Sequence, residues 1–460
     1  MNPKKFSHAK AQRRKGAKED PLGSRRFTSA PFREKTTQNS MRFSSQVTWT
    51  FATRVLMIVN SVVAGIIVAQ WLGAEGVGAL AVINVSVATA VQLGTFGLPS
   101  SNTYFIAQDQ GRLRSAAINS LMFVLIVGSL LGLGLSALAS ARPDLFGFVS
   151  PDLIRLAALS IPFQLLSLIG LNILLAAGKV REFNFLDLAT QSFVLINALI
   201  ALVVLNRELT TLVTLNTVTS ILAGLVVVVL LVVSAKKLAA ANWRADIALL
   251  RRMIQYGLKF HVSILVGAII IRADLLVVNH FRGAAEAGVY SVATQFGLLL
   301  MLLPGVIATL LFPRVTAEQD ARGETTCQAT RYTTFVMFLC CLAAVPFSLL
   351  LPVLYGIEFA GATRLLLILL PGVYLMGLES VLVQHFNALG LPRAIPIYWV
   401  VTLALNLFLV FTLVPRFGAE GAAIASTISY AAIFALVALH FHTTTGRSFS
   451  EVFVLGSLRG

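Results

Sequence analysis

The feature that most constrains this chain is a series of apolar runs, each about 20 residues long, that recurs along most of its 460 residues. A helix of about 20 apolar residues crosses the hydrocarbon core of a bilayer, which is roughly 30 Å thick. Only 12% of the residues are charged, whereas about 25% are charged in an average soluble domain. The pattern predicts an all-α polytopic membrane protein.

About twelve transmembrane helices are expected, joined by short connectors. They cover residues 47–69, 79–101, 117–140, 153–177, 184–205, 211–234, 258–281, 289–312, 333–354, 364–388, 395–414 and 420–441. The connectors that would lie on the side of the N-terminus carry 16 Lys and Arg residues, and those on the other side carry six. Because cytoplasmic connectors are enriched in Lys and Arg, we expect both termini in the cytoplasm.

The first 42 residues hold 12 Lys and Arg against three acidic residues. A segment of this composition buries too little apolar surface to fold, so we expect a basic disordered tail. The tail would lie in the cytoplasm near anionic lipid. The alternatives are an over-extended reading frame with Met41 as the true start, a transit peptide and a nucleic-acid arm, and we expect no nucleic-acid partner. No apolar segment of a secretory signal follows within the first 40 residues.

The connector 235–257 separates two halves of the chain. Trp243, Ile247, Leu250 and Ile254 follow one another at i, i+4, i+7 and i+11. This spacing predicts an amphipathic helix in the cytoplasmic interface, with a solvated linker as the alternative.

Glycine motifs repeat between the halves at nearly constant offsets. The aligned pairs are Gly73 with Gly283 and Gly78 with Gly288, at an offset of 210, and Gly178 with Gly390 and Arg181 with Arg393, at an offset of 212. The repeat predicts two six-helix lobes related by a parallel duplication, around a central cavity. The expected units are a tail (1–42), an N-terminal lobe (43–234), a linker helix (235–257), a C-terminal lobe (258–442) and a cytoplasmic tail (443–460).

Sequence motifs for catalysis are missing. The chain has no GxxxxGK[ST] and no HExxH, and its three cysteines, Cys327, Cys340 and Cys341, show no metal-ligand spacing. We therefore expect no cofactor and no enzyme activity, since an enzyme such as a glycan polymerase would also need a longer outer loop. A two-lobed helical bundle with a polar seam favours secondary transport.

Charged residues inside the spans are candidates for the transport site, because a charge in hydrocarbon normally faces a cavity or a partner. Arg272 and Asp274 both lie in the span 258–281. Residues two apart on a helix point about 200° apart, whereas His261 and Asn279 lie within about 20° of Arg272. We therefore expect His261, Arg272 and Asn279 to share one face, so that one charge lines the cavity while the other pairs with a neighbouring helix.

Further candidates lie in other spans. Arg54 in the first span either lines the cavity or extends to the cytoplasmic interface. Asn84 and Gln92 in the second span either line the cavity or hydrogen-bond between helices. Glu379, midway through the tenth span, is like Asp274 either an ion-coupling or a structural carboxylate.

Four stretches resemble the bacterial polysaccharide-biosynthesis flippases of the multidrug/oligosaccharidyl-lipid/polysaccharide exporter superfamily. They are VAQWLGAEGVGALAV, LGTFGLPSSNTYFIAQ, IRADLLVVNHFRGAAEAGVYSVATQ and RFGAEGAAIAST, and the resemblance spans about residues 42–442. It implies two lobes around a cavity with alternating access, and a substrate that is an oligosaccharide on a polyprenyl diphosphate. It also implies transport from the cytoplasmic to the outer leaflet of a bacterial inner membrane.

By this resemblance Arg54 and Arg272 would hold the diphosphate, since a guanidinium donates a fork of two hydrogen bonds to phosphate. Asp274 matches the carboxylate of the family's seventh span. The implied partners are the lipid-linked oligosaccharide, membrane lipid, and polysaccharide polymerase and chain-length proteins. The connector NRELTT (206–211) lacks the family's glycine motif, and the basic extension 1–40 lies outside the pattern. A cation or drug antiporter of the same superfamily and a lipid II flippase remain the rival functions.

Overall fold

The computed structural model describes residues 30–460 except 207, 237–244, 319, 391 and 455–460. The chain forms two compact units, Met1–Phe51 and Ala52–Gly460, and the features below belong to the second. Residues 1–29 of the expected basic tail lie outside the described residues, and α1 begins at Ala30, before the expected end of that tail.

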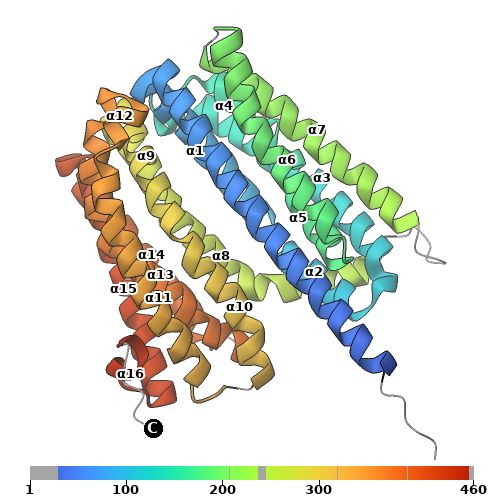
Figure 1. Ribbon diagram of the computed structural model, residues 1–460. Coiled ribbons are helices and arrows are strands. Elements are labelled where there is room, and N and C mark those ends of the chain that lie inside the picture. Colours follow the sequence, from blue (N-terminus) through green and yellow to red (C-terminus); the bar gives the residue numbers. More distant parts are fainter. Residues whose placement is uncertain (1–29, 207, 237–244, 319, 391, 455–460) are drawn as a thin grey trace, which may run out of the picture. The chain divides into compact units, whose positions relative to one another are not determined.

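Every element among the described residues is helical (Figure 1). The α-helices are α1 (Ala30–Gly94), α2 (Leu98–Gln108), α3 (Leu113–Ala141), α4 (Pro151–Ala158), α5 (Ile161–Ala176), α6 (Val180–Ala198), α7 (Leu209–Lys236), α8 (Ile247–Arg282), α9 (Ala284–Leu300), α10 (Leu302–Glu318), α11 (Glu324–Ser348), α12 (Leu351–Tyr355), α13 (Ala360–Leu389), α14 (Ala394–Phe417), α15 (Ala419–Thr445) and α16 (Phe449–Phe453). Short 3-10 helices cover Gln110–Arg112 (η1), Pro143–Phe146 (η2) and Ile357–Phe359 (η4), and a π-helix, η3, covers Leu199–Val204.

Eleven helical segments of the described chain are long and apolar enough to cross a membrane, which confirms a multi-pass membrane protein. The first of them, Thr53–Gly94, has 42 residues and would be roughly 60 Å long if straight, twice the hydrocarbon thickness. It is broken at Gly73, where φ is 65° and ψ is −173°. The first two expected spans, 47–69 and 79–101, are therefore largely the two arms of one bent helix, which accounts for eleven segments where the hydropathy pattern predicts twelve.

The helices of the second unit pack as two bundles. In the N-bundle, which we define as α1 from Ala52 onward together with α2–α7, α5 packs against α2, α3 and α7. In the C-bundle, α9–α15, helix α13 packs against α9, α10, α11 and α15. The N-bundle has its own core around Val82, Leu165 and Ile169, and the C-bundle has one around Tyr290, Leu366 and Val410.

Glycines turn the chain at matching places in the two halves. Gly73 and Gly283 have φ of 65° and 91°, and Gly178 and Gly390 have φ of 77° and 115°. A side chain at positive φ is strained, whereas glycine adopts it freely. The glycines that align in the sequence repeat therefore adopt the same kind of backbone conformation.

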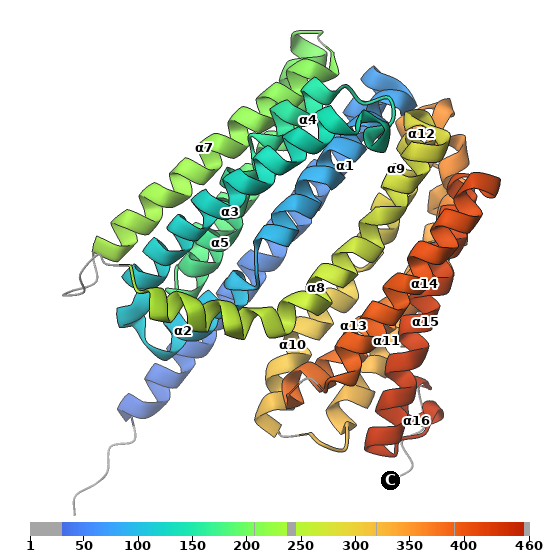
Figure 2. The same cartoon turned by 180° about the vertical axis from the view of Figure 1, so that it is seen from behind.

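Helix α8 connects the two bundles as one continuous helix from Ile247 to Arg282, with a bend between its first turns and the rest (Figure 2). Its first turns are attached to the N-bundle, where Leu249 and Met253 are buried in the core. The hydroxyl of Ser101 donates to the carbonyl of Met253 at 2.6 Å. The helix therefore contains both the end of the expected linker and the whole expected seventh span, with no break at residue 257.

The buried face of this first part differs from the expected stripe. Ile247 is 76% exposed, whereas Leu250 and Ile254 of the stripe pack against the N-bundle core, and Leu249 and Met253 are buried in it. Trp243 lies outside the described residues. The first turns of α8 pack against α2 and α3. The positions of these two helices, and not the apolar spacing alone, therefore determine which face of α8 is buried.

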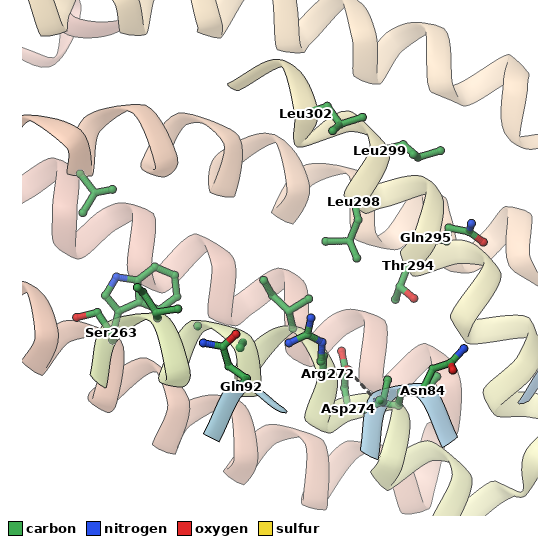
Figure 3. Close-up of a pocket in the computed structure, with 18 of the residues that line it drawn as sticks. Asn84, Gln92, Ser263, Arg272, Asp274, Thr294, Gln295, Leu298, Leu299 and Leu302 are labelled. Atoms are coloured by element: carbon green, nitrogen blue, oxygen red, sulfur yellow. Dashed lines mark hydrogen bonds between the residues drawn. The ribbon is translucent and has the colours of Figure 1, made fainter. Parts of the chain in front are cut away.

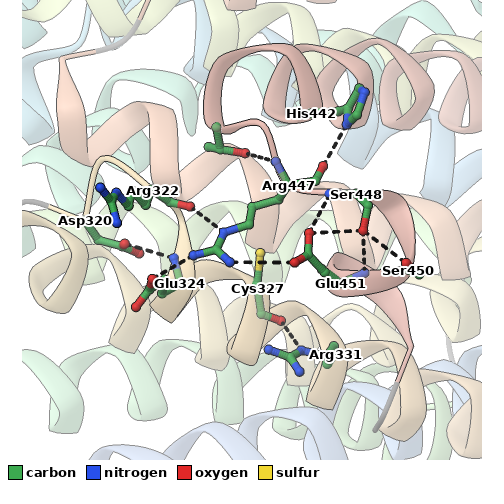
Figure 4. A network of polar contacts seen from close by, with 11 residues as sticks. Asp320, Arg322, Glu324, Cys327, Arg331, His442, Arg447, Ser448, Ser450 and Glu451 are labelled. Atoms are coloured by element: carbon green, nitrogen blue, oxygen red, sulfur yellow. Dashed lines mark hydrogen bonds and ion pairs between the residues drawn. The ribbon is translucent and has the colours of Figure 1, made fainter. Parts of the chain in front are cut away.

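The chain after α15 is attached to the C-bundle by Arg447 (Figure 4). Its guanidinium contacts Glu324 at 2.7 Å and Glu451 at 3.8 Å, and donates to the carbonyl of Arg322 at 3.1 Å. Ser448 caps α16 by hydrogen bonds with Glu451, which lower the pKa of that carboxyl. Arg447 therefore holds the turn between α10 and α11 against the start of the expected C-terminal tail.

Candidate functional site

A cavity of about 1210 Å³ lies between the N-bundle and the C-bundle (Figure 3). Its walls come from α1 and α2 on one side and from α8, α9, α10, α13 and α14 on the other. Most of the lining is apolar, with hydroxyl and amide groups distributed along it. The polar lining residues are Ser61, Asn84, Gln92, Ser100, Tyr256, Ser263, Arg272, Asp274, Ser291, Thr294, Gln295, Gln384, Asn387 and Trp399.

Arg272 is the positively charged residue among the described residues that line this cavity. Its side chain is half-buried, and no ion pair joins it to another described residue. Asn84 and Gln92 of α1 line the same cavity, so the structure brings together three of the residues expected there. An unpaired guanidinium between neutral amides is suited to an anionic group of a polar ligand.

Asp274, two residues further along α8, is only 1% exposed and bonds into the C-bundle. Its carboxylate accepts hydrogen bonds from the hydroxyls of Tyr290 of α9 and Ser426 of α15, the latter at 2.8 Å, and from the N–H of Leu275. The two charges therefore act on different neighbours, as the helical rotation between them requires. Asp274 fixes the position of α8 against α9 and α15.

We expect Asp274→Asn to destabilise the protein rather than to change the chemistry of the cavity. The amide keeps one acceptor but directs an N–H₂ at donors, so a buried hydroxyl loses its partner, which costs about 1–3 kcal/mol. The midpoint of thermal unfolding and the membrane abundance should fall, while the transport rate per folded molecule stays near the wild-type value. Ser426→Ala, which removes one donor, should have the same effect to a smaller extent. A large loss of rate at normal abundance would contradict a structural role.

His261 and Asn279 share a face with Arg272 but bond to the N-bundle instead of lining the cavity. Nδ1 of His261 lies 3.2 Å from the hydroxyl of Thr95, and its ring stacks on Phe96. Nδ2 of Asn279 donates to the carbonyl of Phe146 at 2.9 Å. This side of α8 therefore meets the N-bundle at His261 and Asn279 and borders the cavity at Arg272, between them.

Arg54 also lies outside the cavity lining. Its guanidinium is 3.1 Å from the carboxylate of Asp187 in α6, and one helical turn and a half further on Asn60 donates to the hydroxyl of Ser192 in α6 at 2.8 Å. Ile58 and Ser61 border the cavity, and Ser61 lies within about 20° of Arg54 by helical rotation, so the guanidinium of Arg54 reaches sideways to α6 from the edge of the cavity-facing side.

Glu379 borders a second cavity of about 550 Å³, within the C-bundle. The residue is 1% exposed, and its Oε1 atom has no hydrogen-bond partner among the described residues. Gln384 and Trp399 line both cavities, so the two spaces adjoin. An unpartnered carboxyl beside a cavity is a group that can exchange a proton or a cation with it.

The cavity is closed at the end of the bundles that holds Gly73, Gly283 and Glu358, which we call the Gly283 end. Here α1 and α9 touch through their backbones: a Cβ atom at Gly78 would lie 1.7 Å from the carbonyl oxygen of Ala284, and one at Gly288 would lie 2.0 Å from that of Ala74. Glycine is required for such a close approach. The aligned glycines of the sequence repeat therefore face each other across the two bundles.

Hydrogen bonds reinforce this closure. The carboxylate of Glu358 accepts from the N–H of Ala74 at 2.9 Å, and Gln70 donates to the carbonyl of Leu354 at 3.0 Å. At the opposite end, where α13 ends and α14 begins, no hydrogen bond joins the described residues of α2 to those of α13 or α14. Among the described residues, the hydrogen bonds that close the Gly283 end therefore have no counterpart between α2 and α13 or α14 at the opposite end.

No cluster of three or more His, Cys, Asp or Glu side chains suited to a metal ion occurs in the described part of the chain. Comparison with known proteins gives a family. Residues 43–319 match the family described as "Polysaccharide biosynthesis protein". The chain belongs to this family. The match covers the whole N-bundle, α8 and α9, and so includes Arg272 and Asp274.

Relatives of the chain are named as flippases or transporters. It is 23% identical over 218 residues to a probable low-salt glycan biosynthesis flippase, Agl15, of Haloferax volcanii, covering 46% of each chain. It is 24% identical over 184 residues to a putative O-antigen transporter of Shigella flexneri, covering 39% of this chain and 44% of the other. The matched region spans less than half the length of these relatives.

Solved structures share the fold. The lipid II flippase MurJ, in an inward closed conformation, matches with a TM-score of 0.68 at 16% identity, over 87% of this chain and 89% of that one. A multidrug resistance MATE transporter in its inward-facing conformation matches with a TM-score of 0.68 at 15% identity, over 85% and 96% of the two chains. The outward-facing conformation of a MATE transporter matches with a TM-score of 0.58 at 16% identity, over 87% and 97%. The two-lobe helical fold predicted from the sequence is confirmed.

Proposed function

We propose that the protein flips a polyprenyl-diphosphate-linked oligosaccharide from the cytoplasmic to the outer leaflet of a bacterial plasma membrane. The product would serve surface polysaccharide synthesis, such as O-antigen, capsule or exopolysaccharide. The observation that carries the proposal is the unpaired Arg272 in a cavity whose other polar lining is neutral, apart from Asp274, which is bonded to Tyr290 and Ser426. A phosphate needs a guanidinium or comparable donors when it leaves water, and sugar hydroxyls need amides.

The closed Gly283 end supports this direction of transport. The excess of Lys and Arg on the connectors of the other side supports a cytoplasmic location for both termini and an outward-facing Gly283 end. The cavity would then receive substrate from the cytoplasmic leaflet and release it after the contact between Gly78 and Gly288 opens. A polysaccharide polymerase and chain-length proteins would act on the released substrate.

Deletion of the gene tests this function. Lipid-linked oligosaccharide should accumulate in the cytoplasmic leaflet and surface polysaccharide should be lost, with both restored by the wild-type gene. Loss of surface polysaccharide without accumulation would contradict a flippase. In proteoliposomes, the purified protein should move a fluorescent polyprenyl-diphosphate glycan between leaflets.

Export of cationic drugs is a second candidate, because the fold matches a multidrug transporter. A cavity that binds cationic drugs would need an accessible carboxylate. Asp274, however, is bonded to Tyr290 and Ser426. Dye export that persists without glycan synthesis would favour it. Transport of lipid II is the third, and rescue of cells that lack their own lipid II flippase would favour that.

We expect Glu379→Gln to uncouple transport from an ion gradient. The amide has nearly the same shape but cannot take up or release a proton or hold a cation. Transport driven by an imposed gradient should fall several-fold in proteoliposomes, while exchange without a gradient stays unchanged. Ser380→Ala, on the neighbouring residue of the same small cavity, is the matched control and should keep the gradient dependence. An unchanged response in Glu379→Gln would leave the carboxyl with a packing role.

A further inference from the structure

We infer that the cavity selects lipid-linked glycans whose sugars carry no acidic group, and that Gln384, Asn387 and Trp399 contact these sugars. The inference rests on the proposed flippase function and adds the class of glycan. It follows from where the charged and the neutral groups of the lining are found.

The described lining of the cavity presents a single free charge. Arg272 and Asp274 are the residues of its described lining that carry a charge at neutral pH. The carboxylate of Asp274 is occupied by the hydroxyls of Tyr290 and Ser426 and is nearly inaccessible. One guanidinium therefore remains for the ligand, and the diphosphate, present in every substrate of this class, would occupy it.

Part of the polar lining lies further than Arg272 from the Gly283 end, namely Trp399, Gln384 and Asn387. Trp399 packs beside α8 at Gly267, where a Cβ atom would lie 3.4 Å from the indole ring. Gly267 precedes Arg272 by five residues, which is about 7–8 Å along the helix. Gln384 and Asn387 lie in the last two turns of α13, which ends at Leu389. Sugars attached to a diphosphate at Arg272 would therefore lie against Trp399 and these amides.

Neutral side chains discriminate against acidic sugars. An amide both donates and accepts hydrogen bonds, as a sugar hydroxyl does, and an indole face gives an apolar surface with a polar edge. A carboxylate that leaves water needs a cationic partner, and without one its transfer costs several kcal/mol. Arg314 and Arg393 are exposed and lie two residues beyond the lining residues Phe312 and Ile395. These two arginines would attract any anion to the entrance of the cavity. Because they remain in water, they would discriminate little between neutral and acidic glycans.

The test compares two substrates in proteoliposomes that contain the full-length protein. The substrates are fluorescent polyprenyl-diphosphate trisaccharides that differ only in a terminal hexose or hexuronate. We expect the wild-type protein to flip the neutral substrate at least about ten-fold faster, as an uncompensated carboxylate in a cavity predicts.

Gln384→Lys and, separately, Asn387→Lys should raise flipping of the hexuronate substrate several-fold and narrow the ratio between the substrates. Gln108→Lys is the matched control, because Gln108 is exposed at the end of α2 and does not line the cavity. It should leave the ratio unchanged. Size-exclusion chromatography checks that each variant is folded, and the wild-type ratio decides the question even where a variant is not.

Equal wild-type rates for the two substrates would overturn the inference and leave the flippase function intact. A faster rate for the acidic substrate would also overturn it. If neither substrate moves, the proposed function itself fails.

Discussion

Arg272→Ala is expected to lower flipping by about 10- to 150-fold without lowering the amount of folded protein. A charge-assisted hydrogen bond contributes about 1.5–3 kcal/mol, and each 1.4 kcal/mol is a factor of ten. The substitution removes the free charge of the cavity and leaves Asp274 with its partners in the C-bundle, so stability should change little. Initial rates in proteoliposomes, normalised to folded protein, measure the effect.

Two further substitutions make this result specific. Arg272→Lys keeps the charge but loses the planar fork, so its rate should lie between those of the wild type and Arg272→Ala. Arg54→Ala removes an arginine that is paired with Asp187 outside the cavity, and its rate per folded molecule should stay near wild type. Normal flipping by Arg272→Ala, or an equal loss in Arg54→Ala, would refute a specific anion site at Arg272.

Gly288→Val is expected to keep the Gly283 end from closing and to reduce flipping by an order of magnitude or more. Even a Cβ atom at this position would lie 2.0 Å from the carbonyl oxygen of Ala74, an overlap that only a separation of α1 and α9 relieves. Because closure of one end of the cavity is half of an alternating-access cycle, a protein that cannot close there should leave the cavity open to the outside.

A cysteine at Ser291, which lines the cavity near this contact, reports the opening. An impermeant maleimide added from outside should label it much faster in Gly288→Val than in the parent. Gly288→Ala should show the same change more weakly. Gly305→Ala is the control, because a Cβ atom at Gly305 meets no atom within 4 Å. Unchanged labelling and flipping in folded Gly288→Val would show that the contact is not needed for closure.

The fold was largely predictable because hydropathy and glycine positions act locally. Runs of about 20 apolar residues define the spans, and the aligned Gly73 and Gly283 are both turning points with positive φ. The hydropathy pattern predicts two separate spans where the structure has one helix bent at Gly73. Hydropathy alone does not distinguish a sharp bend within a helix from a short connector between two helices.

The site was predictable only in part. Helical rotation separates Arg272 from Asp274: Arg272 lines the cavity unpaired, while the hydroxyl partners of Asp274 lie in the C-bundle. It does not tell which neighbour a face meets, and for that reason His261 and Asn279 were expected in the cavity but bond to the N-bundle. Trp399 was not expected to line the cavity, because a tryptophan in an apolar run gives no signal of its own.

The unbroken course of α8 has a consequence for its length. Its first turns are bonded to the N-bundle, while Arg272 and Asp274 further along depend on their angles around the helix axis. One residue inserted between Gly257 and Arg272 would rotate the rest of the helix by about 100° around its axis and shift it by about 1.5 Å along the axis. The guanidinium would leave the cavity and the carboxylate would leave its hydroxyl partners in a single step. Between Gly257 and Arg272, residue types can therefore vary while the number of residues cannot.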